Sequence, residues 1–172
     1  MKTIQCKCGQ LIQLDDEDHS KLSKFSWQCN GKMVYHQRTI NGKHQNINMG
    51  CCVTDIPNGL VPDHKDRNFH NNVSSNVRCA TEQQNRANSG PQGDGYKYVT
   101  KMNRVTPKPF VMKIMKDGIR YVSVHSTAGE AAKAGDLKAI ELWGEFAYTN
   151  FPRENYTTQQ PVRDVAPVDH QI

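Results

Sequence analysis

Long apolar runs are missing from this sequence. Hydrophobic residues make up 36% of its 172 residues and aromatic residues 8%, and the mean hydropathy is −0.75. No apolar stretch approaches the roughly 20 residues of a membrane-spanning helix, so we expect no membrane partner. The start, MKTIQCKCGQ, lacks the apolar core of a secretion signal, which predicts a cytoplasmic protein with reduced thiols. So little apolar material favours small modules over one large core.

The cysteines also lack the regular pairing of a zinc module. They form one C-x-C, one C-C and two singletons, at Cys6, Cys8, Cys29, Cys51, Cys52 and Cys79. Structural zinc sites usually show two pairs spaced by two to four residues. The spacing therefore argues against zinc and favours free thiols, some of them buried as small apolar residues.

Basic residues outnumber acidic residues in this sequence. The net charge is +5 and the isoelectric point is about 8.9, which fits a nucleic-acid partner but also many ordinary proteins. The segment from Tyr96 to Arg120 is more biased, with Asp117 as its one acidic residue. Its seven basic residues are Lys97, Lys101, Arg104, Lys108, Lys113, Lys116 and Arg120. We expect one face of this segment to meet phosphates, with an ordinary basic surface as the alternative.

Turn signals divide the chain. Residues 3–13 indicate a short strand pair broken at Gly9, and the acidic run that follows is typical of a helix start. Asn41-Gly42 predicts a hairpin over residues 33–49, whose basic side chains, including Arg38, either lie on DNA or face solvent. Residues 87–95 have the composition of a linker. Beyond it we predict strands over residues 96–102, 110–116 and 119–124, then a helix that begins after Ser126 and ends at Gly144.

The most informative stretch runs from Pro62 to Asn88. Asp63 and His64 lie at the end of a predicted strand, Asn76 follows twelve residues after His64, and Asn85 nine residues after that. Carboxylate and amide oxygens are hard ligands that suit Mg²⁺ or Mn²⁺. A histidine can take a proton from water near neutral pH. The sequence therefore predicts a metal and proton-transfer site here.

Two further features of this stretch support that interpretation. Thr81 and Gln84 have the spacing of a capping box, so a helix carrying Asn85 should follow a returning strand. Basic side chains surround the site and indicate a phosphate substrate. They are Lys65, Arg67, Arg78 and Arg86.

The stretch GLVPDHKDRNFHNNVSSNVRCATEQQN resembles the HNH family of endonucleases, and is most similar to the phage homing endonucleases with an Asp-His, Asn, Asn pattern. The segment GEAAKAGDLKAIELWGEFAYTNFP resembles the plant ethylene-response-factor type of DNA-binding domain. The N-terminal LDDEDHSKLSKFSW is similar to the leader of phage proteins that combine the two modules. Together these resemblances cover roughly residues 3–152.

The resemblance implies a role for each matching residue. Asp63 and Asn85 would hold one Mg²⁺ or Mn²⁺, His64 would be the general base, and Asn76 would hold the loop that orients His64. Water would attack in line and leave 5′-phosphate and 3′-hydroxyl ends. Arg78 would neutralise an adjacent phosphate.

The second resemblance implies a three-stranded sheet that enters the major groove of double-stranded DNA. Lys97, Lys101, Lys113 and Arg120 match the positions nearest to the bases. A phage relative would act in the cytoplasm of an infected host cell.

Three positions depart from the family pattern. Gly50 stands where many relatives carry a histidine, Arg67 replaces the glycine of an Asp-Gly-Asn turn, and Phe110 replaces a tryptophan. The glycine replacement predicts either a strained backbone at Arg67 or a different loop.

Together these features predict an α+β protein. A small ββα-metal nuclease module with N-terminal strands and a hairpin occupies residues 1–88, residues 89–95 link it to a three-stranded antiparallel sheet packed on one helix (96–152), and residues 153–172 form a flexible tail. The predicted function is a monomeric, metal-dependent homing-type DNA endonuclease with an extended recognition site. The alternatives are a DNA-binding regulator with a disabled nuclease module, and a zinc-stabilised binding module in the cysteine-rich front half.

Overall fold

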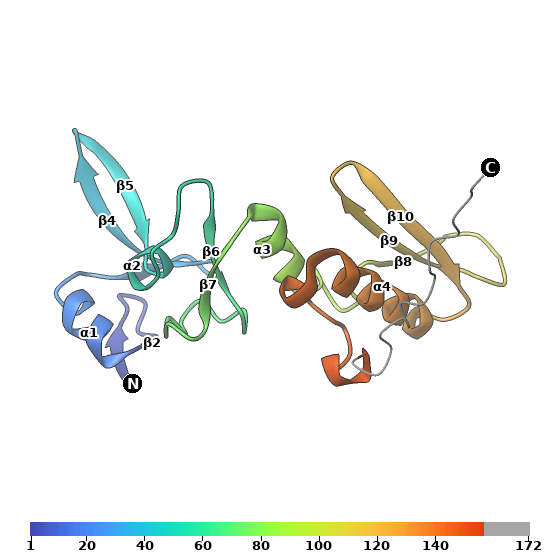
Figure 1. The fold of residues 1–172 in the computed structure, drawn as a ribbon, viewed down its shortest axis with the longest axis horizontal. Helices are drawn as coiled ribbons and strands as arrows, with labels where there is room; N and C mark the ends of the chain where they lie inside the picture. The colour runs from blue at the N-terminus through green and yellow to red at the C-terminus, as the bar shows by residue number, and fades with distance from the viewer. Residues whose placement is uncertain (157–172) are drawn as a thin grey trace, which may run out of the picture. The chain divides into compact units, whose positions relative to one another are not determined.

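The computed structural model describes residues 1–156, which divide into two compact units (Figure 1). The first unit contains residues 1–92 and 139–148, and the second contains residues 93–138 together with the described residues from 149 on. Of the tail predicted over residues 153–172, Arg153–Tyr156 form a short 3-10 helix, η2, and the rest lies outside the described residues.

The first unit is built from small antiparallel sheets and short helices. Its sheets are a β1-β2 pair, a β3-β4-β5 sheet and a β6-β7 pair. The bounds along the chain are β1 Lys2–Gln5, β2 Leu11–Leu14, α1 Asp16–Leu22, β3 Gln28–Cys29, β4 Val34–Ile40, β5 Lys43–Asn48, α2 Gly50–Val53, β6 Val61–His64, β7 Val77–Ala80, α3 Glu82–Asn88 and the 3-10 helix η1 Gly144–Phe146.

Local signals set the two N-terminal hairpins. The β1-β2 turn contains Gly9 with φ of 88°, as the sequence predicts. The β4-β5 turn places Asn41 and Gly42 at φ of 50° and 73°, the positive values that a type I′ turn requires. Both hairpins are therefore confirmed.

One core joins these pieces. Ile12, Leu14, Trp27, Val34 and Met49 are almost fully buried and form one cluster. Trp27 also donates its ring N–H to the carbonyl of Leu22, at 2.9 Å, which satisfies the one polar atom of a buried indole. Phe25, by contrast, is 39% exposed and packs edge-on against Trp27 at the margin of this core.

The β6-β7-α3 segment follows the predicted strand, loop, strand, helix order. In the β6-β7 register Asp63 faces Arg78 and His64 faces Val77. The Thr81 side chain accepts from the Gln84 backbone while the Gln84 side chain accepts from the Thr81 backbone, which confirms the capping box. This cap fixes where α3 begins, and therefore which of its side chains face β6.

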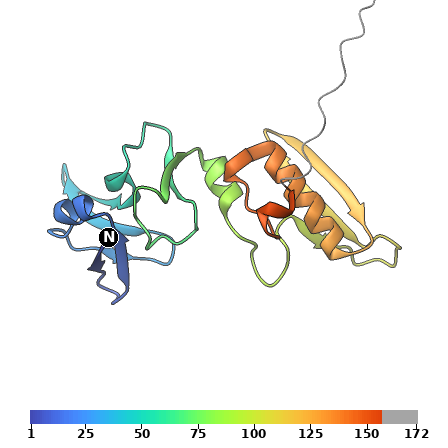
Figure 2. The same cartoon turned by 60° about the horizontal axis from the view of Figure 1, so that its bottom comes forward.

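The second unit contains a three-stranded antiparallel sheet of order β10-β9-β8, covered on one face by α4 (Figures 1 and 2). The bounds are β8 Val99–Lys101, β9 Phe110–Lys116, β10 Ile119–His125 and α4 Ala128–Trp143. α4 packs against Tyr98 and Met112 at Gly135, where a Cβ would lie 3.4 Å from the Tyr98 Cβ and 3.5 Å from the Met112 Cγ, both ordinary contact distances. The α+β class predicted from the sequence is confirmed.

Two local predictions need correction in this unit. The first strand is shorter than predicted, since residues 96–98 form a turn that places Tyr98 at φ of 68°. The α4 cap is Thr127 rather than Ser126, because the Thr127 hydroxyl accepts from the Glu130 N–H at 3.1 Å. Within residues 1–156, no helix is long and apolar enough to cross a membrane.

Candidate nuclease site

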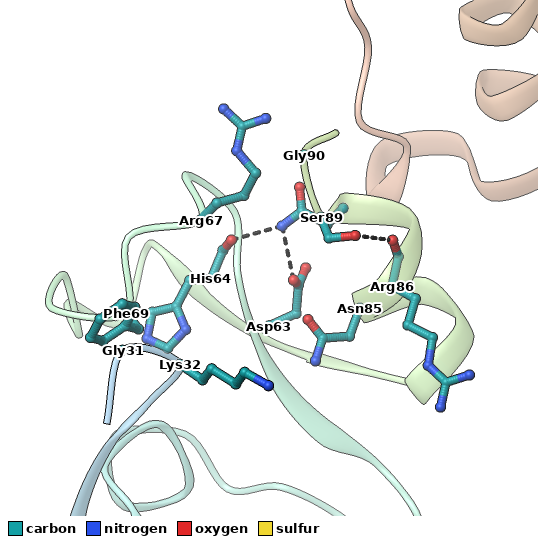
Figure 3. Close-up of a pocket in the computed structure, with 11 residues that line it drawn as sticks. Gly31, Lys32, Asp63, His64, Arg67, Phe69, Asn85, Arg86, Ser89 and Gly90 are labelled. Atoms are coloured by element: carbon teal, nitrogen blue, oxygen red, sulfur yellow. Dashed lines mark hydrogen bonds between the residues drawn. The ribbon is translucent and has the colours of Figure 1, made fainter. Parts of the chain in front are cut away.

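Strand β6 and helix α3 together form the walls of a cavity of about 750 Å³ in the first unit (Figure 3). β6 contributes Asp63 and His64 at its end, and α3 contributes Asn85 and Asn88, which lie three residues apart and so share one helix face. The β6-β7 pair and the capped helix α3 thus bring Asp63, His64 and Asn85 to one pocket, as predicted from the sequence.

Asp63 is the buried anchor of this pocket. Its side chain is 2% exposed, and its two carboxylate oxygens accept from different donors. Asn88 donates to Oδ1 at 2.8 Å, and Arg78 donates through Nε to Oδ2 at 2.8 Å. The Asn88 amide also donates to the backbone carbonyl of His64 at 2.7 Å. Asn88 therefore fixes both members of the Asp-His pair.

Arg78 is held inside the unit rather than presented to solvent. Its side chain is 12% exposed, and the guanidinium lies 3.9 Å from the centre of the Phe146 ring. A second nitrogen, Nη1, lies 3.2 Å from a carboxylate oxygen of Glu145. Because Arg78 compensates the buried charge of Asp63, its position favours a role in organising the site over direct contact with a phosphate.

His64 has a defined tautomer. Its Nε2 lies 3.1 Å from the Oδ1 of Asn72, and the Asn72 amide group donates to the Phe69 carbonyl at 2.9 Å. The second bond fixes which end of the amide is the acceptor, so Nε2 carries the proton and Nδ1 keeps its lone pair. Burial lowers the pKa of nearby His70.

The loop between β6 and β7 is held by Asn76. The Asn76 amide donates to Asp66 Oδ1 at 2.9 Å and to the Asn71 carbonyl at 2.7 Å, and its oxygen accepts from the Asp66 N–H at 3.1 Å. Burial raises the pKa of Asp66, but hydrogen bonds from Asn71, Asn68 and Asn76 outweigh that effect and lower it. Arg67, which replaces the glycine of the family turn, adopts a left-handed φ of 65°. The strained backbone predicted at this position is therefore observed, and not a different loop.

The basic residues of the first unit lie at different distances from the pocket. Arg67 and Arg86 line it, together with Lys32. Lys65 is exposed and donates to the Ser75 carbonyl at 2.8 Å, and Arg38 is exposed on β4 opposite Gln45. The structure therefore brings Arg67 and Arg86 to the site and leaves Arg38 on the hairpin.

The four basic residues singled out in the second unit do not share one face. Lys113 is paired with Val122 across β9 and β10, and Arg120 with Met115, so both lie on the sheet face opposite α4. Lys101 pairs with Phe110 and has its ammonium 6.0 Å from that ring, while the Lys97 ammonium lies 4.7 Å from the ring of Tyr98, before β8. Only the first pair belongs to the exposed face.

Sequence reasoning missed two residues that line the pocket, Asn88 and Lys32, and one that holds His64 from behind it, Asn72. Asn88 had a usable signal, because it lies one helical turn after Asn85. Asn72 had the signal of a turn residue only, yet it is 1% exposed and bonds His64. Lys32 had none, since it reaches the pocket from the β3-β4 connection through tertiary structure alone (Figure 3).

Comparison with known proteins agrees with this geometry. A sequence model of the HNH endonuclease family matches residues 54–87, a span that includes Asp63, His64, Asn76 and Asn85 and stops one residue before Asn88. A protein of Acanthamoeba polyphaga mimivirus, described as an uncharacterized HNH endonuclease, is 33% identical over 133 residues, which cover 75% of this chain and 68% of the relative. The chain belongs to the HNH endonuclease family. No solved structure matches it significantly.

Family membership supplies the coarse chemistry. HNH endonucleases are nucleases that generally use a divalent metal ion, and membership implies a DNA substrate. The oxygen atoms in this pocket suit such an ion. An ionised carboxylate has about four lone-pair positions, and the hydrogen bonds from Arg78 and Asn88 occupy only two of those on Asp63. Asn85 is exposed in the same pocket and forms no side-chain hydrogen bond among residues 1–156, so its amide oxygen is available as a second hard ligand.

Proposed function

We propose that this HNH protein is a homing-type DNA endonuclease that depends on Mg²⁺ or Mn²⁺. Asp63 and Asn85 hold the ion, both through oxygen, and Lys32 adds a positive charge that favours a phosphate in the pocket. A bound divalent ion would stabilise negative charge on the scissile phosphate and on the departing 3′ oxygen.

His64 acts as the general base through Nδ1. Asn72 holds the proton on Nε2, so the lone pair of Nδ1 accepts a proton from the attacking water. Asn76 does not contact the substrate. It holds residues 66–71 of the loop that connects β6 to β7, through its bonds to Asp66 and Asn71. In-line attack then gives 5′-phosphate and 3′-hydroxyl ends.

The remaining cations bind the DNA backbone. Arg67 and Arg86 lie at the pocket and contact phosphates near the cut, while Lys65 and Arg38 contact phosphates further away. Arg78 supports the site by compensating the charge of Asp63. These contacts extend the recognition site beyond the two nucleotides at the cut.

The second unit serves as the ethylene-response-factor type of DNA-binding domain. Lys113 and Arg120 contact DNA from the exposed sheet face, beside the apolar side chains of Met115 and Val122. Lys97 and Lys101 contact the phosphate backbone from the β8 edge. The whole protein acts as a monomer in the cytoplasm of a phage-infected cell.

The observation that supports the proposal is the tautomer of His64 that Asn72 selects, in a pocket that also contains the side chains of Asp63 and Asn85. The test is cleavage of plasmid and long genomic DNA by the wild type, His64→Ala and His19→Ala, each with Mg²⁺ and with EDTA. His19 lies on α1 and outside the pocket residues, so it is a matched histidine control. We expect metal-dependent nicking or cutting by the wild type and His19→Ala, and none by His64→Ala. DNA that stays intact with all three proteins would refute the proposal.

One observation favours the second candidate, a DNA-binding regulator without nuclease activity. Gly50 replaces the family histidine, and its position is too tight to restore that side chain, since a Cβ there would lie 2.7 Å from the Pro62 Cβ. Salt-sensitive gel shifts by a protein that leaves DNA intact with Mg²⁺ and Mn²⁺ would support this candidate.

A further inference from the structure

Three cysteines from two separate segments meet at one edge of the first unit, outside the nuclease pocket. Cys6 and Cys8 lie in the turn between β1 and β2, and Cys29 lies at the end of β3. Their sulfur atoms all lie within 4.8 Å of one another, and the sulfurs of Cys6 and Cys8 are 2.8 Å apart. Spacing along the chain does not reveal this cluster, because the third member comes from another sheet.

In the turn that carries Cys6 and Cys8, a backbone N–H is directed at one of the sulfur atoms. The Cys8 N–H points at the Cys6 sulfur, at 3.4 Å, and the Gly9 N–H donates to the Cys6 carbonyl at 2.9 Å. Gly9 permits this tight turn through its positive φ of 88°. A sulfur bound to a metal can keep such an N–H contact, so the turn suits a metal-bound Cys6 as it stands.

The core holds the two segments in place. Cys6 is 3% exposed and belongs to the cluster that contains Trp27 and Val34. The Lys7 N–H donates to the Trp27 carbonyl at 2.9 Å, which attaches the turn to the segment that leads into β3. Cys8 is exposed and Cys29 is half-buried, so the cluster opens towards solvent on one side.

We infer that Cys6, Cys8 and Cys29 form a zinc site whose fourth ligand is water or an external donor. Thiolates are soft ligands that select zinc over magnesium, and three protein ligands with one open position is an established zinc geometry. With Zn–S bonds of about 2.3 Å in a tetrahedron, ligand sulfurs lie about 3.8 Å apart. The observed cluster needs only small side-chain adjustments to reach that spacing. The ion would hold the β1-β2 turn against β3.

The test begins with the full chain, purified in reductant without added metal. We expect about one zinc per chain by elemental analysis. Apo protein titrated with Co²⁺ should develop thiolate-to-metal charge-transfer absorption and the intense visible bands of tetrahedral coordination. These readouts do not depend on nuclease activity, so they separate this inference from the proposed function.

Variants assign the ligands. Cys8→Ser should lose the zinc, and Cys8→His should keep it, because imidazole is also a zinc ligand. Cys8 is exposed, so neither change disturbs the core, and exposed Cys51, outside the cluster, provides the control Cys51→Ser. Zinc retained by Cys8→Ser, or a wild type that gives only octahedral Co²⁺ spectra, would overturn the inference. So would a disulfide between two of the three cysteines, identified by mass spectrometry after alkylation of protein kept free of metal and reductant.

Discussion

Asn88 and Asn85 lie on one face of α3, and the structure gives them opposite roles that substitution can separate. Asn88 is 7% exposed and donates to a buried carboxylate and to a backbone carbonyl. Hydrogen bonds to charged groups contribute about 1.5–3 kcal/mol and neutral ones about 0.5–1.5 kcal/mol. We therefore expect Asn88→Ala to lower the free energy of unfolding by about 2–4 kcal/mol.

Asn85→Ala should leave stability nearly unchanged. Its side chain is exposed and forms no hydrogen bond within residues 1–156, and such changes usually stay within about 0.5 kcal/mol. If Asn85 is a metal ligand, the Mg²⁺ or Mn²⁺ concentration for half-maximal cleavage should rise by at least about 10–100-fold, the range seen even for residues behind the ligands.

Urea unfolding followed by tryptophan fluorescence is the stability assay. Trp27 lies in the core of the first unit, so its fluorescence reports on the unit that carries the site, and Trp143, which ends α4, is replaced by Phe in all proteins compared. Cleavage rate against metal concentration is the second assay. A destabilised Asn85→Ala beside a fully stable Asn88→Ala would refute the assignment, and so would an unchanged metal requirement in Asn85→Ala.

Three further predictions concern the supports of the site, each measured by urea unfolding. Gly50→Ala should lower the free energy of unfolding by about 1–3 kcal/mol, because the new Cβ overlaps Pro62 at 2.7 Å. An unchanged free energy of unfolding would show that β6 can shift to accommodate the Cβ. Arg78→Ala should cost about 3–5 kcal/mol by leaving the buried Asp63 charge without its partner, and a loss below about 1 kcal/mol would contradict the ion-pair argument. The pKa of Asp66 is lowered in the folded protein, so its contribution to the free energy of unfolding is present above the ordinary Asp pKa and is lost as pH falls through the lowered value. The difference in unfolding free energy between wild type and Asp66→Asn should therefore shrink on acidification. A difference that grows would refute this sign.

Much of the fold could be predicted because its signals are local. Asn41-Gly42 and Asp117-Gly118 adopt the positive φ angles that tight hairpins require, and each hairpin forms where the sequence predicts it. The Thr81 capping box depends on atoms only three residues apart. The strand that ends in Asp63 and His64 was also predictable, because the apolar residues Leu60 and Val61 come just before them in the chain.

What the sequence determined alone was therefore the residue types of the site, their order and the elements that carry them. The tertiary structure decided which atoms meet. Asn88 reaches Asp63 across 25 positions of sequence, Cys29 joins two cysteines more than twenty positions earlier, and Glu145 meets Arg78 across 67 positions. Such contacts have no local signature, because they arise only when the packing of a shared core fixes the distance between segments that are far apart in the chain.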